Sequence, residues 1–139
     1  MEFKLPLEQF YHWEKETPYK TYLKQPHQGK WKAFMWSEVS KQVRSMASFL
    51  MVQDLPSGSN IAICSKNSAY WVMADFAIWL SGHISVPLFP NLDSASMKKL
   101  IEHSEVQMIF LEKGKDWEKT KNAFPKSLKK VFFPPHHDK

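Results

Sequence analysis

A strand, a buried helix and a second strand are expected in immediate succession in the middle of the chain, and this succession restricts the fold most. Asn60–Ser65 is short, β-branched and bounded by turn residues, as in a strand buried within a parallel sheet. In residues 68–82, 11 of 15 side chains are apolar, which predicts a helix over Ala69–Ser81 that is buried on nearly all sides. The next strand is Ile84–Val86, and we expect Pro87 to stop it.

The flanking segments continue this alternation of helices and strands. An apolar stripe at helical spacing predicts a long amphipathic helix that begins after Ser37, the expected N-cap, and ends near Met51. We expect Asn67 or Ser68 to cap the buried helix, and Gly82 to end it. The other expected elements are a helix over 6–16, extended segments over 19–24 and 30–35 joined by a turn over 25–29, a helix capped by Asp93 or Ser94, a strand over 106–111, a weaker helix over 117–124 and a strand over 129–133.

Strands that alternate with helices imply right-handed crossovers between parallel neighbours. The sequence therefore predicts an α/β fold: a mostly parallel sheet with helices on both faces, plus an N-terminal antiparallel β-hairpin. We expect one domain over residues 1–133, followed by a tail over residues 134–139.

The composition is that of one folded domain in a reducing compartment. The 139 residues are 43% hydrophobic and 14% aromatic, which excludes a disordered tail. The single Cys64 excludes a disulfide framework. The longest apolar run, Ala69–Leu80, is interrupted by Asp75 and is too short to cross a membrane. The start of the chain lacks the order of a secretory signal, so we expect a cytoplasmic location.

A search for sites that carry chemistry finds little. The glycines are widely separated, which excludes a dinucleotide fingerprint and a P-loop. Cys64 falls within an expected buried strand, which favours a core thiol over a nucleophile. The histidines have no metal-ligand spacing, and the adjacent pair His136 and His137 would need further ligands. We therefore expect no metal-binding residue.

Two polar features have a structural and a functional interpretation. Asp75 stands alone in an apolar helix, which favours a structural hydrogen bond over a catalytic acid or base. The triplet Lys30-Trp31-Lys32 could stack on single-stranded nucleic acid, but packing of Trp31 on a helix is the favoured interpretation.

The C-terminal part of the chain is basic. Residues 98–139 carry 10 Lys or Arg against 6 Asp or Glu, a net charge of +4. This balance allows a surface for phosphate or anionic membranes, although a solvated face is the favoured interpretation.

Motifs in a fixed order carry a resemblance to a known family. Lys66–Trp71, Ala74–Ala77 and Gly82–Pro90 form its centre, with Trp36–Val39 upstream and His103–Glu105 downstream. In this order the chain resembles the adenylate-forming, or AMP-binding, superfamily, and most of all its acyl-CoA synthetases of the long-chain fatty acid type. The resemblance implies the first subdomain of the large N-terminal domain of such an enzyme.

The resemblance implies a reaction in two steps for the parent enzyme. A fatty acid carboxylate attacks the α-phosphate of ATP, with Mg²⁺, to give acyl-AMP, and coenzyme A then displaces AMP. The family's Ser/Thr/Gly-rich loop for the ATP phosphates has no counterpart in this sequence, nor does its catalytic lysine. We therefore assign no catalytic, cofactor-binding or metal-binding residue, and expect an N-terminal fragment of a long-chain fatty acid–CoA ligase that is inactive alone.

The alternative is a non-catalytic interaction or dimerisation module built on the same fold. The expected partners are the remainder of the ligase domain or a second copy of the chain, with fatty acid bound only through the parent enzyme. The resemblance also allows peripheral association of the parent with the inner membrane face. We expect no nucleic acid as a partner.

Overall fold

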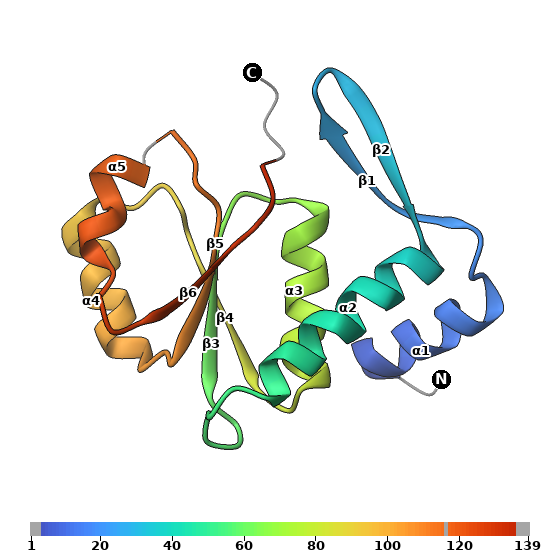
Figure 1. Cartoon of the computed structure of the whole chain (residues 1–139), viewed down its shortest axis with the longest axis horizontal. Coiled ribbons are helices and arrows are strands. Elements are labelled where there is room, and N and C mark those ends of the chain that lie inside the picture. The colour runs from blue at the N-terminus through green and yellow to red at the C-terminus, as the bar shows by residue number, and fades with distance from the viewer. Residues whose placement is uncertain (1–3, 116, 136–139) are drawn as a thin grey trace.

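The computed structural model describes residues 4–115 and 117–135, which form an α/β fold (Figure 1). The helices are α1 (Pro6–Glu16), α2 (Trp36–Met51), α3 (Ala69–Leu80), α4 (Ser94–Ser104), α5 (Trp117–Thr120) and the 3₁₀ turn η1 (Lys121–Ala123). The strands are β1 (Thr21–His27), β2 (Lys30–Met35), β3 (Asn60–Cys64), β4 (Ile84–Leu88), β5 (Met108–Leu111) and β6 (Lys129–Phe132).

Four strands form a parallel sheet in the order β4-β3-β5-β6, and β1 and β2 form a separate antiparallel hairpin. In Figure 1, α2 and α3 lie on one side of the sheet and α4 and α5 on the other. The predicted fold class is therefore confirmed, including the N-terminal hairpin and the helices on both faces.

Alternate side chains of the strands face opposite sides of the sheet, as strand geometry requires. On β3, Ile61 and Ile63 pack in the cluster that contains Leu50 of α2 and Ile78 of α3. Their neighbours Ala62 and Cys64 pack in the cluster on the α4 side. The sheet is thus covered on both faces, which explains why its strands are apolar runs without polar alternation.

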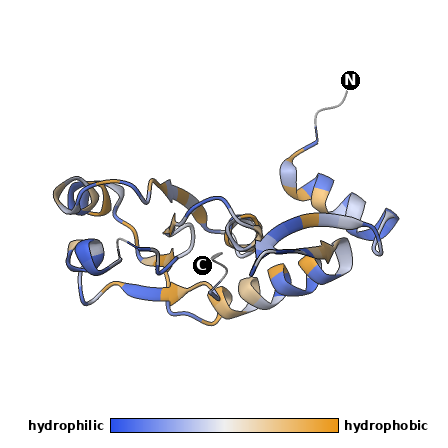
Figure 2. Cartoon of the chain, turned by 90° about the horizontal axis from the view of Figure 1, so that it is seen from above, coloured by the Kyte–Doolittle hydropathy of each residue, from blue (hydrophilic) through white to orange (hydrophobic). Residues whose placement is uncertain are grey.

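A third cluster joins α1, the hairpin, α2 and α3. Its buried members are Phe10, Phe34, Val39, Val43, Ala47, Ala69, Met73 and Ala77. Because α3 contributes to this cluster and to the sheet core, none of its residues is exposed, as the sequence predicted. Figure 2 shows hydrophilic and hydrophobic residues mixed along the outer helices, which have only one packed face.

Ser68 caps the buried helix α3 and Asp93 caps α4, and each is one of the two caps predicted for its helix. The Ser68 hydroxyl accepts a hydrogen bond from the Trp71 N–H (3.1 Å), and Asp93 Oδ1 accepts one from the Ser96 N–H (2.9 Å). Gly82 has a φ of +80°, which a glycine adopts at little cost after a helix.

The predicted N-cap of α2 is wrong by two residues. Met35, not Ser37, is the N-cap, and the Glu38 carboxylate accepts the Met35 N–H (2.7 Å). The Ser37 N–H donates to the carbonyl of Pro18 (2.9 Å). A carbonyl that is distant in sequence therefore satisfies a free N–H of the first turn, which otherwise calls for a capping side chain.

The predicted stop at Pro87 is wrong, because β4 continues through it to Leu88. The strand order places β4 at an edge of the sheet, where a residue without an N–H removes no bond to a further strand. Apart from β1, which ends three residues later than predicted, the other strand and helix ends agree with the predicted ones within two residues, and the predicted helix over 117–124 is α5 followed by η1.

The turn of the hairpin is shorter than predicted. It consists of Gln28 and Gly29, with φ values of 50° and 73°, and β1 extends through Pro26 to His27. Two positive φ values match the type I′ turn that suits a two-residue hairpin loop. Pro26 pairs with Trp31, one position from the closing pair of the hairpin, and alternate antiparallel pairs exchange no hydrogen bonds.

Candidate functional site

The carboxyl ends of β3 and β5 form the candidate functional site. The chain leaves β3 toward α3 on one face of the sheet and leaves β5 toward α5 on the other (Figure 1). Open parallel sheets bind ligands where neighbouring connections separate in this way. A cavity of about 110 Å³ lies here, and its lining includes Cys64, Lys66, Asn91, Glu112, Lys115 and Trp117.

Glu112 organises this end of the sheet. Its Oε2 accepts hydrogen bonds from the Ser65 hydroxyl (2.9 Å) and the Lys66 N–H (2.8 Å). Its own N–H donates to the carbonyl of Cys64 (3.2 Å). Glu112 thus ties the loop after β3 to the end of β5. Sequence reasoning missed this residue, and the available signal was its position directly after an expected strand.

Cys64 faces the same cavity but is buried, as the sequence predicted. Burial raises the pKa of its thiol to about 11, and the nearby negative charge of Glu112 acts in the same direction. Because the thiolate is the nucleophilic form, Cys64 is unreactive at neutral pH.

We expect the Cys64 thiol to resist alkylation in the folded chain. At pH 8 a thiol of pKa about 11 is ionised in about one molecule per thousand, so iodoacetamide should label it at least about 100-fold more slowly than in the unfolded chain. Mass spectrometry of samples taken over time, with and without guanidinium, measures this ratio. Equal rates in both states would show that the thiol is exposed and activated.

The cavity at the strand ends is small. Ligand pockets enclose about 300–1,000 Å³, so a volume of about 110 Å³ cannot by itself hold a nucleotide or an acyl chain. It has room for a few water molecules or a small anion beside Lys66 and Lys115. Residues 4–115 and 117–135 therefore do not form a complete pocket for such a ligand at this site.

A larger concavity, here named the β6 groove, lies beside the edge strand β6. It has a volume of about 350 Å³. The rings of Phe110 and Phe133 stack there at 5.8 Å, and Tyr70 packs against Phe133 at 6.1 Å. The groove is lined by Gln42, Ser45, Met46, Phe49, Tyr70, Phe110, Val131, Phe132, Phe133 and Pro134. It is an apolar surface beside the last strand of the sheet.

The structure places the other predicted residues apart from this site. Asp75 is half-buried on α3, where burial raises the pKa of its carboxyl and the Ser85 hydroxyl acts in the opposite direction. The Ser85 hydroxyl is nevertheless buried without a hydrogen-bond partner, so the structural hydrogen bond that the sequence favours for Asp75 stays a prediction. In the described part of the chain, no three His, Cys, Asp or Glu side chains gather as a metal site would need. His136 and His137 lie outside the described residues.

The predicted packing of Trp31 on a helix is wrong. Its side chain is 71% exposed, close to the turn at the far end of the hairpin. The tryptophan that packs at the base is Trp36, whose ring stacks on Tyr22 with centroids 3.7 Å apart. Sequence alone could not show which of the two tryptophans is packed and which is exposed, because exposure depends on the distance of the hairpin tip from α2 and α3.

Gln25 is a second residue that sequence reasoning did not single out for its role. It is buried, and its Oε1 accepts a hydrogen bond from the Ala69 N–H (2.8 Å) at the first turn of α3. A side chain of β1 thereby caps a helix 44 residues further along the chain and ties the hairpin to α3.

Replacing Gln25 with alanine should lower the free energy of unfolding by about 1–3 kcal/mol, because it leaves the buried Ala69 N–H without an acceptor. Urea unfolding followed by circular dichroism measures the change. Lys24→Ala, at the exposed neighbouring position, is the matched control and should change stability by less than about 0.5 kcal/mol. Equal stabilities of the two variants would contradict the capping role.

The model of the AMP-binding enzyme family matches residues 10–135 of this chain. The chain belongs to this family. The predicted resemblance is thereby confirmed, and the matched residues include the whole sheet and the hairpin.

Similar curated proteins include the peroxisomal long chain acyl-CoA synthetase 6 of Arabidopsis thaliana, which is 29% identical over 82 residues. The match covers 59% of this chain and 12% of the relative, so the chain spans about an eighth of that protein's length.

Solved structures share the fold. IdnL1 superposes with a TM-score of 0.80 at 18% identity, over 92% of this chain and 25% of its own. The N-terminal subdomain of NpsA from Klebsiella oxytoca superposes with a TM-score of 0.71 at 14% identity, over 95% of this chain and 32% of its own. At these identities the likeness establishes the fold and no shared activity.

Proposed function

We propose that residues 1–133 form the N-terminal scaffold subdomain of a long-chain fatty acid–CoA ligase. Such a ligase converts a fatty acid with ATP and Mg²⁺ to acyl-AMP, and then with coenzyme A to acyl-CoA. The observation that carries this proposal is the family match over residues 10–135, together with the likeness to a long chain acyl-CoA synthetase. The likeness to a structure described as an N-terminal subdomain supports the proposed position in the enzyme.

In this proposal the chain supplies architecture and no catalytic residue. Glu112 and Cys64 at the strand ends hold backbone and fill the core, and the cavity between them is too small for the substrates. No residue described here is assigned to ATP, Mg²⁺ or coenzyme A. We infer that the chain alone does not form acyl-CoA.

The remainder of the ligase domain is the proposed partner of the β6 groove. Among the described residues, β6 is an edge strand with one unpaired side, and Phe49 and Phe132 beside it are 40% and 39% exposed. Apolar surface next to an unpaired strand edge is typical of a face that packs against further protein.

The isolated chain is expected to form no acyl-CoA from ATP, Mg²⁺, palmitate and coenzyme A, as measured by mass spectrometry. The Arabidopsis relative named above serves as positive control for the assay. Acyl-CoA formation by the chain alone would contradict its proposed inactivity.

A chimera tests the scaffold role itself. This chain replaces the matching segment of the Arabidopsis relative, and the same relative without that segment is the control. We expect the chimera to retain measurable palmitate activation and the control to lose it. A soluble, folded chimera without activity would contradict the scaffold proposal.

A second proposed function is a non-catalytic interaction or dimerisation module, and the β6 groove is the observation that favours it. Light scattering during size-exclusion chromatography tests it. A chain that remains monomeric at all concentrations would count against self-association.

In either function we propose a cytoplasmic location, because the single cysteine is a free, buried thiol. In the described residues, no helix is long and apolar enough to cross a bilayer.

A further inference from the structure

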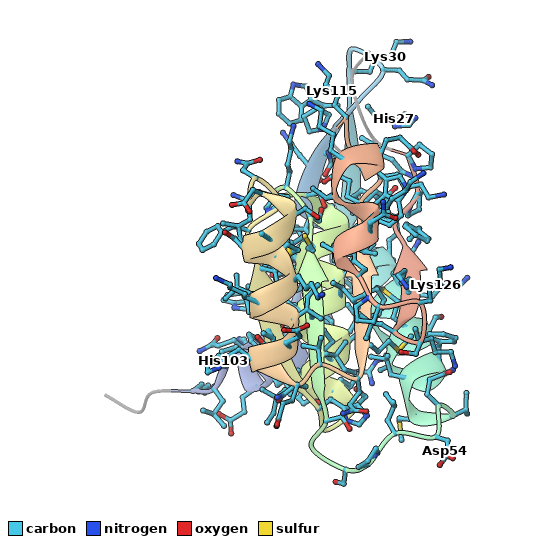
Figure 3. The ribbon with its side chains drawn as sticks, turned by 90° about the vertical axis from the view of Figure 1, so that its left-hand side faces the viewer. His27, Lys30, Asp54, His103, Lys115 and Lys126 are labelled. Carbon is cyan, nitrogen blue, oxygen red and sulfur yellow. The ribbon has the colours of Figure 1, made fainter. Side chains whose placement is uncertain are left out.

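The β1–β2 hairpin projects from the body of the molecule. Figure 1 shows its tip extending well beyond α2 and α3, and Figure 3 shows Lys30 at the end of the molecule, with Lys115 and His27 toward the same end. Gln25, two residue pairs from the closing pair His27 and Lys30, ties β1 to the start of α3, and the tip beyond it ends in a two-residue turn. The hairpin thus presents a short protruding tip that is anchored to the body of the molecule.

The hairpin carries positive charge only. Residues 21–35 contain Lys24, Lys30 and Lys32 and no Asp or Glu, a net charge of +3. Residues 1–97 carry 9 basic and 8 acidic side chains, a net charge of +1, so the rest of that region has a net charge of 1 − 3 = −2. All three lysines are exposed. The positive charge of this part of the chain is therefore concentrated on the projecting element.

The exposed apolar group on the hairpin is Trp31. It pairs across the hairpin with Pro26, which is also exposed, and Lys24 lies on the same face two residue pairs closer to the base. A tryptophan ring combines a large apolar body with one N–H donor, and it prefers the boundary between water and lipid headgroups.

We propose that the tip of this hairpin binds an anionic lipid surface, with Trp31 in the headgroup layer and the lysines against the acidic headgroups. Charge complementarity and the exposed tryptophan are both needed for such binding, and both are present on the same protruding turn. The inference deepens the proposed function, since a long-chain fatty acid is an amphiphile that partitions into membranes.

The shape of the tip favours a lipid surface over single-stranded nucleic acid. Proteins that bind single strands combine a basic groove with several aromatic side chains on which successive bases stack. Here a narrow turn carries one exposed aromatic ring, and such a convex tip inserts into a headgroup layer without needing a groove.

Co-sedimentation of the purified chain with vesicles tests the proposal. One vesicle preparation contains equal parts of phosphatidylcholine and phosphatidylserine, and the other contains phosphatidylcholine alone. We expect binding to the anionic vesicles that weakens as salt is raised, and little binding to the neutral ones. No substrate is present, so the outcome is independent of whether the chain belongs to an active ligase.

Variants locate the binding surface. Trp31→Ala should weaken binding about tenfold, because it removes the apolar contact. Lys24→Ala with Lys30→Ala should weaken it about 30-fold, at about tenfold per 1.4 kcal/mol and about 1 kcal/mol per lysine. These two lysines are chosen because Lys32 lies over the Phe34 ring, at 4.9 Å, and contributes to packing.

Matched controls change the same groups elsewhere. Phe89→Ala removes an aromatic side chain that is 76% exposed, and Lys98→Ala with Lys99→Ala removes two exposed charges from α4. Both should bind vesicles as the unchanged chain does. Absence of binding to anionic vesicles, or equal losses in hairpin and control variants, would overturn the proposal. So would a single-stranded oligonucleotide that binds more tightly than the vesicles and depends on Trp31.

Discussion

Replacing Phe110 with alanine should lower the free energy of unfolding by about 3–5 kcal/mol. Its side chain is 1% exposed on β5, between the neighbouring strands β3 and β6, and its ring stacks on Phe133. The substitution removes the phenyl ring from the core on the α2–α3 side of the sheet. Because Phe110 also lines the β6 groove, the groove should then extend into the space that the ring filled. Urea unfolding followed by circular dichroism measures the loss.

Two further variants test whether the loss of stability comes from the buried position of the ring. Phe110→Leu retains much of the apolar volume and should cost clearly less than Phe110→Ala. Phe89→Ala removes the same ring from an exposed position and should cost less than about 0.5 kcal/mol. If Phe110→Ala were no less stable than Phe89→Ala, the packing described for β5 would be wrong.

Replacing Phe10 with alanine should have a comparable effect, about 3–5 kcal/mol, through a different cluster. Phe10 is the buried residue of α1, and its ring lies 4.9 Å from that of Phe76 and 6.1 Å from that of Trp36. Without this ring, α1 is tied to α2 mainly through Glu14, which pairs with the half-exposed Arg44 and accepts a hydrogen bond from the Ser40 hydroxyl, and each of these contacts is worth about 1 kcal/mol.

The loss should therefore appear first in α1. Limited proteolysis is expected to cut within residues 4–17 of Phe10→Ala before the rest of the chain, in addition to the lower midpoint of urea unfolding. Tyr11→Ala changes the adjacent, largely solvent-facing ring and is the matched control. Equal protease resistance of the two variants would show that α1 is not anchored by Phe10.

The functional site was less accessible to sequence reasoning than the fold. The sequence identified Cys64 as a core thiol, because a cysteine within a short β-branched run is almost always buried. It did not identify Glu112 or Gln25, whose partners lie more than 40 residues away. An acidic or amide side chain near a strand has no local pattern that reveals which distant N–H it will meet.

Local patterns were sufficient to predict the helices and strands and to reduce the caps of α3 and α4 to two candidates each, because these depend on neighbours within a few residues; the structure selects Ser68 and Asp93. The same patterns in a fixed order were sufficient for the family. The strand order was decided only in three dimensions, and with it the edge positions of β4, which allows Pro87 within the strand, and of β6, which pairs with β5 on one side in the described part of the chain. The exposure of Trp31 was decided in the same way. Periodicity records which side of an element is apolar, whereas an edge or a protruding tip depends on what the rest of the chain covers.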